Sequence, residues 1–118
     1  MDFRLSHRAI GCAMRVHRTL GCGFLERVFA NALAMELTLS GISFQKETRL
    51  QVRYRGKVVG DYFADFTIER ELLLEIKALK SLNEICEAQL VNYLHASGVH
   101  TGLLINFGAR SLQFKRMT

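Results

Sequence analysis

The chain has 118 residues, of which 49% are hydrophobic and 23% are charged, and it contains no proline. This length and composition fit one globular domain, residues 1–118, and they exclude a fibrous repeat and a largely disordered chain. The 16 Lys and Arg residues against 11 Asp and Glu give a net charge of +5. Such a charge suits nucleic acid as a partner, although many small domains are mildly basic without one.

Neither a membrane span nor a signal peptide is apparent, because no apolar run approaches roughly 18 residues and the N-terminus lacks a long apolar stretch. The cysteines Cys12, Cys22 and Cys86 are an odd number at wide spacings, which favours reduced thiols. We therefore expect a cytoplasmic protein without a membrane partner. Cys12, His17 and Cys22 include no close cysteine pair, so we do not expect zinc, and we interpret His17 as a hydrogen-bonded core residue.

Two segments near the N-terminus predict helices. In residues 6–20 the apolar side chains fall on one arc of a helical wheel, and Gly21 ends the segment. Residues 24–40 are apolar around most of the wheel, which predicts a largely buried helix closed by Gly41. Glu26 lies inside this apolar arc, either as a first-turn glutamate favoured by the helix dipole or as a site residue.

The segment RLQVRYRG, residues 49–56, alternates apolar and polar side chains and predicts a strand with one face on the core and a basic outer face. Four residues of this region are candidates for phosphate contacts, namely Arg49, Arg53, Arg55 and Lys57. A solvated charged face without a ligand is the alternative.

Two apolar runs, residues 62–68 and 72–78, predict an antiparallel hairpin around a loop of residues 69–71. If Ile68 lies across from Leu72, the register places Asp65 directly opposite Glu75. The first face of the hairpin is then apolar, with Ala64, Phe66, Ile68, Leu72, Leu74, Ile76 and Ala78. The second face carries Phe63, Asp65, Leu73, Glu75 and Lys77.

The opposition of Asp65 and Glu75 needs a compensating charge. Directly opposed side chains have Cβ atoms about 4.5 to 5.5 Å apart, and like charges at this distance destabilise a sheet. A divalent cation such as Mg²⁺ prefers hard oxygen ligands and would relieve the repulsion, while Lys77 adds a positive charge on the same face. The alternative is a solvated sheet face on which Lys77 is an ordinary ion-pair partner.

A third helix is predicted to begin at a Ser-x-x-Glu capping box, Ser81 and Glu84, and to end at Gly98. Its apolar positions at helical spacing are Leu82, Ile85, Cys86, Leu90, Tyr93 and Leu94. Gln89 interrupts this arc four residues before Tyr93 and on the same side, either as a satisfied interior amide or as a site residue.

Two strands are predicted after the third helix. TGLLINFG, residues 101–108, has the composition of a buried strand, and SLQFKRM, residues 111–117, of a short edge strand or tail. The resulting order ααβββαβ predicts an α/β fold with helices packed on a sheet rather than a helical bundle.

Asp65, followed after nine residues by Glu75-Ile76-Lys77, resembles the Asp…(Asp/Glu)-x-Lys signature of the PD-(D/E)XK nuclease superfamily. Over roughly residues 8 to 110 the chain is also similar to the small bacterial GxxExxY proteins, which are grouped with that superfamily. The matching segments are VHRTLGCGFLERVF, GDYFADFTIERELLLEIKAL, EAQLVNYL and GLLINFG.

The motif that names this group reads Gly23-Phe-Leu-Glu26-Arg-Val-Phe29 here, so Phe29 replaces the tyrosine. A hydrogen bond from that position is lost, while the packing of the ring is kept. Cys22 stands where a proline is usual, which affects only the stiffness of the turn.

The resemblance implies a restriction-endonuclease-like core, with a central mixed β-sheet flanked by helices, and a Mg²⁺-dependent nuclease that hydrolyses phosphodiester bonds, in DNA rather than RNA. It implies that Glu26, Asp65 and Glu75 ligate the metal, for which Mn²⁺ is a possible substitute, with the Ile76 carbonyl as a backbone ligand. Lys77 would orient the attacking water. Since neighbouring carboxylates favour the charged form of a lysine, we favour positioning and charge neutralisation over proton abstraction for Lys77.

Gln89 and Tyr93 match the Gln-x-x-x-Tyr motif of one exonuclease-like branch, which implies that they steady the active site or a substrate phosphate. The competing hypothesis is a non-catalytic nucleic-acid-binding or assembly module on the same fold, whose binding would be salt-dependent and would survive EDTA. A small domain offers a narrow platform, so a homodimer or a larger complex could supply further contacts.

Overall fold

A five-stranded mixed sheet with the strand order β1-β2-β3-β4-β5 forms the centre of the computed structural model, which describes residues 3–118. The strands are β1 (Phe44–Tyr54), β2 (Lys57–Ile68), β3 (Leu72–Lys77), β4 (Thr101–Asn106) and β5 (Gln113–Met117). Neighbouring strands are antiparallel except β3 and β4, which are parallel. A parallel pair needs a crossover connection, and the helix α3 (Glu84–Ser97) supplies it.

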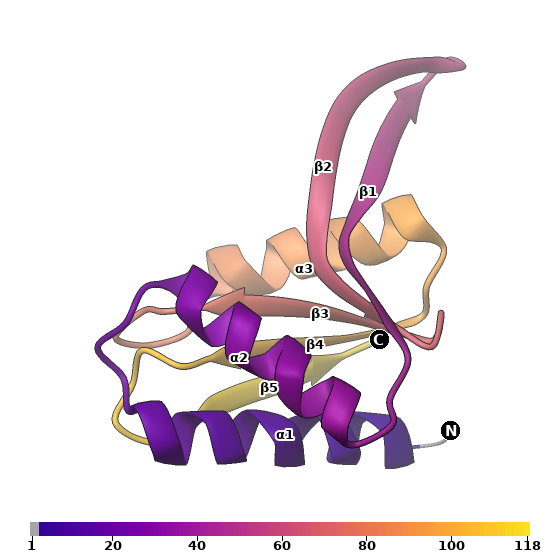
Figure 1. Cartoon of the computed structure of the whole chain (residues 1–118). Helices are drawn as coiled ribbons and strands as arrows, with labels where there is room; N and C mark the ends of the chain where they lie inside the picture. Colours follow the sequence, from indigo (N-terminus) through magenta and orange to yellow (C-terminus); the bar gives the residue numbers. More distant parts are fainter. Residues whose placement is uncertain (1–2) are drawn as a thin grey trace.

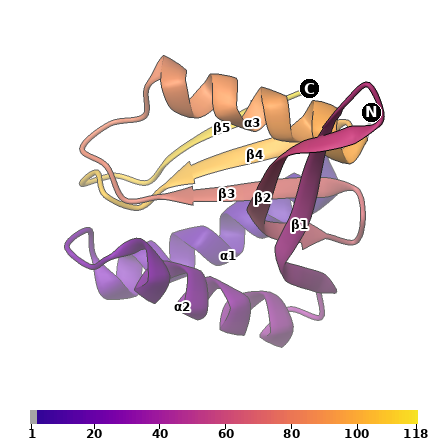
Figure 2. The ribbon, with the colours of Figure 1, turned by 90° about the horizontal axis from the view of Figure 1, so that it is seen from above.

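Helices cover both faces of the sheet. Figures 1 and 2 show α1 (Arg4–Leu20) and α2 (Glu26–Leu39) on one face and α3 on the other. The predicted α/β architecture, a central mixed sheet flanked by helices, is therefore confirmed. Within the described part of the chain, no helix has both the length and the apolar character needed to cross a membrane.

The helix α1 is amphipathic as predicted, because its buried positions recur at helical spacing. The prediction of a largely buried second helix is wrong, since only Phe29, Leu33 and Leu37 of α2 are buried and Leu39 is 79% exposed. These three residues are spaced by four and form one stripe. The helix contacts the sheet and α1 along that stripe, and its other sides face solvent.

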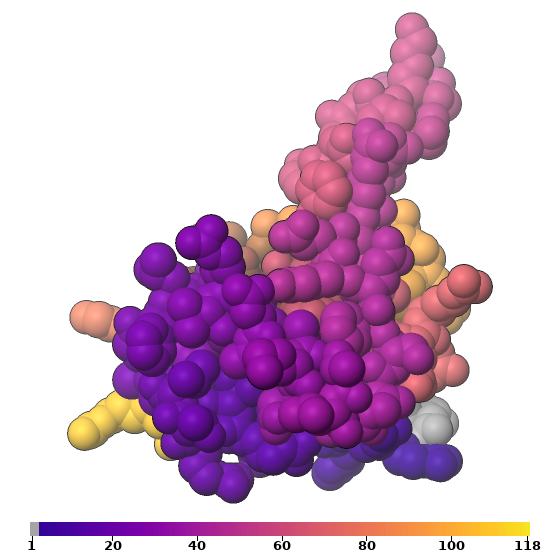
Figure 3. Space-filling view, in the orientation of Figure 1, coloured from indigo at the N-terminus to yellow at the C-terminus, as the bar shows by residue number. Residues whose placement is uncertain are grey.

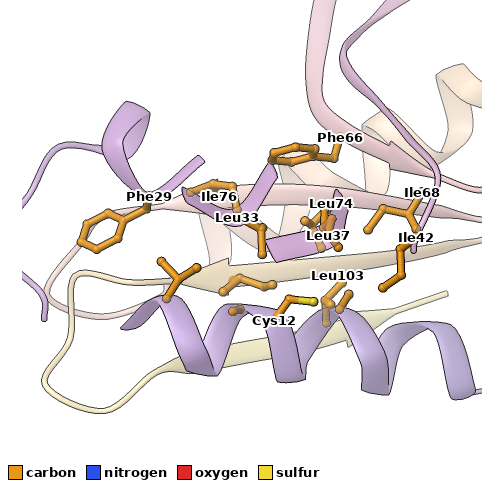
Figure 4. Packing of buried hydrophobic residues seen from close by; sticks show 14 of the residues in the cluster. Cys12, Phe29, Leu33, Leu37, Ile42, Phe66, Ile68, Leu74, Ile76 and Leu103 are labelled. Atoms are coloured by element: carbon orange, nitrogen blue, oxygen red, sulfur yellow. The ribbon is translucent and has the colours of Figure 1, made fainter. Parts of the chain in front are cut away.

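The main core lies between the sheet and the pair α1 and α2. Figure 4 shows side chains of both helices meeting those of the strands, with Phe29, Leu33 and Leu37 above Leu103 and Cys12. The Phe29 ring stacks on Phe107, with ring centroids 4.8 Å apart. A smaller cluster on the opposite face joins α3 to the sheet.

The strands β1 and β2 extend beyond the sheet as an arm, which rises from the body of the molecule in Figures 1 and 3. A two-residue turn joins them, with Arg55 at φ 51° and Gly56 at φ 81°, as a hairpin turn with two left-handed residues requires. Leu50 faces the core as predicted, but Val52 and Tyr54 are exposed. They lie beyond the reach of the core because β3 pairs with only the last part of β2.

The hairpin face and the start of the third helix also differ in detail from the predictions. Ala64 packs in the cluster with α3, whereas Phe66 packs in the main core on the side of α1 and α2. Asn83 caps α3 by accepting a hydrogen bond from Cys86 N at 3.0 Å, so the predicted capping box of Ser81 and Glu84 is wrong. The helix ends at Gly98 as predicted, with φ 75°.

A buried amide fixes the segment between β3 and α3. Asn106 is fully buried at the end of β4, where its side chain accepts a hydrogen bond from Leu79 N at 2.8 Å and donates one to Leu79 O at 2.9 Å. Gly108 lies against the same backbone, and a Cβ there would be 2.4 Å from Leu79 N. This close approach holds the chain that follows Lys77.

We expect Gly108→Ala to lower the free energy of unfolding by about 3 kcal/mol, because backbone atoms must move to admit the methyl group. Gly23→Ala is the matched control, since no atom lies within 4 Å of a Cβ at that position. Urea denaturation of both variants and the parent chain measures the difference. Equal midpoints for the two variants would contradict the close approach.

Candidate active site

The strands β2 and β3 separate at Asp65 and Glu75, the next pair in their register. The ladder runs from Ile68 opposite Leu72 to Phe66 opposite Leu74, which confirms the predicted register. Beyond this point β2 bends away from β3 into the arm (Figure 1). We call this point of separation the fork.

Side chains take over the backbone hydrogen bonds at the fork. Asp65 N donates to Glu75 Oε1 at 3.1 Å, and Ile76 N donates to Asp65 Oδ2 at 2.7 Å. Each carboxyl group is thus held by the backbone of the opposite strand. The carbonyl of a strand residue points to the same side as its N–H, so the Ile76 carbonyl also faces the fork.

Burial raises the pKa of both carboxyl groups at the fork. Glu75 is only 6% exposed, and burial, together with the negative charge of Asp65, raises its pKa to about 8. Burial also raises the pKa of Asp65, against the opposing effect of the hydrogen bond from Ile76 N. The two groups titrate as a pair, because the negative charge of Asp65 disfavours ionisation of Glu75.

Lys77 is the electrostatic partner that the acidic residues share. Its positive charge lowers the pKa of Glu26, Asp65 and Glu75 against the raising effect of burial. Its ammonium group donates to Gln89 Oε1 at 3.2 Å. The charge of Lys77 therefore acts on all three carboxyl groups from a position fixed by α3.

Gln89 connects Lys77 to Tyr93, because Gln89 Nε2 donates to Tyr93 Oη at 3.2 Å. The two α3 residues are one turn apart and face the sheet together. Burial raises the pKa of Tyr93, and so does the nearby charge of Glu75. The structure thus brings Asp65, Glu75, Lys77, Gln89 and Tyr93 into one cluster.

Glu26 is the outlying acidic residue. It is the first residue of α2 and is exposed as a whole, yet partial burial of its carboxyl group raises its pKa, and the charge of Asp65 adds to this effect. Across residues 3–118, no three His, Cys, Asp or Glu side chains are close enough together to form a metal site as they stand. Asp65 and Glu75 are in contact, whereas Glu26 is coupled to Lys77 and Asp65 through electrostatic interaction alone.

The donor atoms at the fork fit a divalent cation with hard oxygen ligands, such as Mg²⁺ or Mn²⁺. Asp65 and Glu75 offer carboxylate oxygens, and Ile76 offers a carbonyl oxygen. A cation would displace the proton that the buried pair retains, since opposite charge favours the ionised forms. The residues present therefore suit the metal that the sequence leads us to expect.

The four basic candidates lie along the arm and differ in their contacts. Arg49 forms a bidentate ion pair with Asp61, with distances of 3.0 and 2.8 Å, and this lowers the pKa of Asp61. Arg53 donates to Gln51 Oε1 and Gly56 O and lines a groove beside α3. Arg55 lies in the turn of the arm, and Lys57 begins β2.

Two residues near the cluster escaped the sequence analysis. Glu47 falls between the pairs Lys46–Phe66 and Thr48–Ala64, opposite Asp65, and its charge raises the pKa of Asp65. It was missed because the predicted first strand began at Arg49, five residues after the observed start of β1 at Phe44. The Tyr62 ring lies 5.7 Å from that of Tyr93. No periodic signal marks Tyr62, which shares the alternation of Ala64 in β2 and, like Ala64, faces α3.

Comparisons with known proteins give a family match and a similar solved structure. A family model described as the PD-(D/E)XK nuclease superfamily matches residues 4–117. The crystal structure of SSO0001 is similar with a TM-score of 0.60 and 20% sequence identity, over 78% of this chain and 48% of that one. The chain spans about half the length of SSO0001, and a likeness at this identity shows the fold alone. A search of the curated proteins found no match. The mixed sheet flanked by helices is consistent with the expected restriction-endonuclease-like core.

The raised pKa of Glu75 predicts that the metal-free protein loses stability with rising pH. The folded state keeps a proton that the unfolded chain releases between the ordinary pKa of 4.5 and the folded value of about 8. The stabilisation from this group is therefore complete below about pH 4.5 and is lost as the pH rises through about 8. Glu75→Gln mimics the protonated side chain, so we expect its melting temperature to fall less over this range.

The measurement is thermal unfolding in EDTA at several pH values. Glu69→Gln, an exposed carboxyl in the β2–β3 turn, controls for the change in net charge. Parallel pH profiles for the parent chain and Glu75→Gln would show that Glu75 is not the responsible group.

Proposed function

The chain belongs to the PD-(D/E)XK nuclease superfamily, and on this basis we propose that it is a Mg²⁺-dependent nuclease that hydrolyses phosphodiester bonds in DNA. The observation that carries the proposal is the buried contact of Asp65 with Glu75 within the electrostatic range of Lys77. We further propose that the chain is one of the GxxExxY proteins, with Gly23, Glu26 and Phe29 as its version of their motif.

We propose that Asp65, Glu75 and the Ile76 carbonyl hold the metal, and that Glu26 contributes from the start of α2. When bound, Mg²⁺ or Mn²⁺ supplies Lewis acidity toward water and the scissile phosphate. Asp65 and Glu75 keep their positions through the backbone hydrogen bonds at the fork, so little reorganisation of these side chains is needed.

Lys77 positions the attacking water and neutralises charge on the phosphate in this proposal. Its ammonium group donates to Gln89 Oε1, and Gln89 is itself oriented by its hydrogen bond to Tyr93. An ammonium group has three donors, so two remain for water and a phosphate oxygen. A donor fixed in advance stabilises developing negative charge without reorganising during the reaction.

A non-catalytic nucleic-acid-binding module is the competing function. A module that only binds gains nothing from two carboxyl groups beside a phosphate backbone, since they repel phosphate and are costly to bury. The retained pair therefore favours the enzyme.

Free Cys12, Cys22 and Cys86 suit a reducing compartment, and we propose that the protein acts in the cytoplasm.

We expect Asp65→Asn to lower the rate of DNA cleavage by at least about a thousand-fold, because the variant keeps an acceptor for Ile76 N and loses the metal-binding charge. Asp61→Asn is the matched control, since Asp61 lies on the same strand and pairs with Arg49. Cleavage of an end-labelled oligonucleotide with Mg²⁺ and with EDTA measures the effect. Undiminished cleavage by Asp65→Asn would overturn the proposed function.

Metal binding itself is tested by thermal unfolding. We expect millimolar Mg²⁺ or Mn²⁺ to raise the melting temperature of the parent chain, because a ligand that binds only the folded state stabilises it. The shift should vanish in Asp65→Asn and persist in Asp61→Asn. A shift that survives in Asp65→Asn would place the cation elsewhere.

A further inference from the structure

A groove of about 840 Å³ runs between the arm and α3. The arm contributes Val52, Arg53 and Tyr62, and α3 contributes Gln89, Asn92 and Tyr93 among other residues. The arm stands beside α3 in Figures 1 and 2, and the bend of β2 separates the two walls.

The groove is continuous with the candidate active site. Gln89 and Tyr93 line it and also belong to the hydrogen-bonded chain that reaches Lys77. Tyr62 lines the groove next to Tyr93, and the centroids of the two rings are 5.7 Å apart. A ligand lying along the groove would therefore reach Lys77 at one end.

The lining of the groove differs in charge from the fork. Val52, Ile85, Ala88 and Ala96 give it apolar walls, and none of its lining residues is Asp or Glu. Tyr62 is 46% exposed, so one part of its ring is open to a ligand. Arg53 supplies a positive charge, and it forms no ion pair with the acidic side chains of the described residues.

An exposed aromatic ring, apolar walls, amide groups and a cation together suit an unpaired nucleic-acid strand. Single strands bind by stacking bases on aromatic side chains while basic residues contact the phosphates. Duplex DNA keeps its bases stacked on one another, so it has no free base face for Tyr62. Near the groove, Arg53, Arg55 and Lys57 make the end of the arm positive, whereas the charge of Asp61 is paired with Arg49.

We propose that this groove binds an unpaired segment of the DNA strand, with one base stacked on Tyr62 and a neighbouring phosphate at Arg53. The inference rests on the proposed nuclease function, because the strand in the groove is the substrate that reaches Lys77. It assigns single-stranded DNA and unpaired ends as the preferred substrate.

The test is the binding of a fluorescein-labelled single-stranded oligonucleotide, and of its duplex, measured by anisotropy in EDTA. We expect the parent chain to bind the single strand more tightly than the duplex, and Tyr62→Ala to weaken single-strand binding by about five-fold or more. Tyr54→Ala is the matched control, because Tyr54 lies on the same arm, is 66% exposed and does not line the groove. This control should bind like the parent chain.

Two further variants separate stacking from folding. Tyr62→Phe keeps the aromatic face and should bind normally, whereas Tyr62→Leu keeps apolar bulk without that face and should bind like Tyr62→Ala. Equal binding by the parent chain and Tyr62→Leu, or duplex binding as tight as single-strand binding, would overturn the inference.

The EDTA condition keeps this result independent of catalysis. If cleavage requires Asp65 but binding ignores Tyr62, the groove proposal falls and the nuclease proposal stands. If binding depends on Tyr62 but no cleavage occurs with Mg²⁺, the nuclease proposal falls and the groove remains a single-strand site.

Discussion

The separation of β2 from β3 at Asp65 and Glu75 is the constraint on which the rest of the structure depends. Where two strands part, backbone N–H groups lose their ladder partners, and a buried N–H without an acceptor is costly. The Asp65 and Glu75 side chains supply the missing acceptors to Ile76 N and Asp65 N. The same requirement forces two carboxyl groups into a buried contact, which the fold tolerates by keeping a proton on Glu75 and by placing Lys77 nearby.

The bend in β2 has a second consequence. It carries β1 and the first half of β2 away from the body as an arm, whose strands have no further layer to cover them. An isolated two-stranded hairpin has little stability of its own, so the arm depends on its continuity with the sheet and on packing near Leu50 and Ala64. The fork and the groove beside α3 thus arise from one distortion of one strand.

Local patterns predicted the register at the fork, but not that the two strands part there. The alternation in residues 62–68 and 72–78 placed Asp65 across from Glu75, and period-two patterning is strict when one face is buried. Predictions of burial were wrong where burial depends on how far the neighbouring elements extend. The wheel of α2 could not show that only one stripe would meet a neighbour, and the alternation near Tyr54 could not show that the sheet ends before it. The position of Glu26 relative to Asp65 is also set by packing between distant segments, which helical spacing does not contain.

The distribution of charge explains how a basic domain can combine an acidic centre with a polyanionic substrate. The raised pKa of about 8 favours the protonated form of Glu75 near neutral pH, which reduces the negative charge at its contact with Asp65. The acidic centre therefore repels a phosphate less than two ionised carboxylates would, and the positive charge of Lys77 reduces this repulsion further. The groove has no acidic lining, so a nucleic-acid strand in the proposed position would meet Arg53 and aromatic surface first and carboxyl groups only at the end next to Lys77. Binding of a cation at the fork would be coupled to loss of the retained proton, since a positive charge there would favour the ionised form of each carboxyl group.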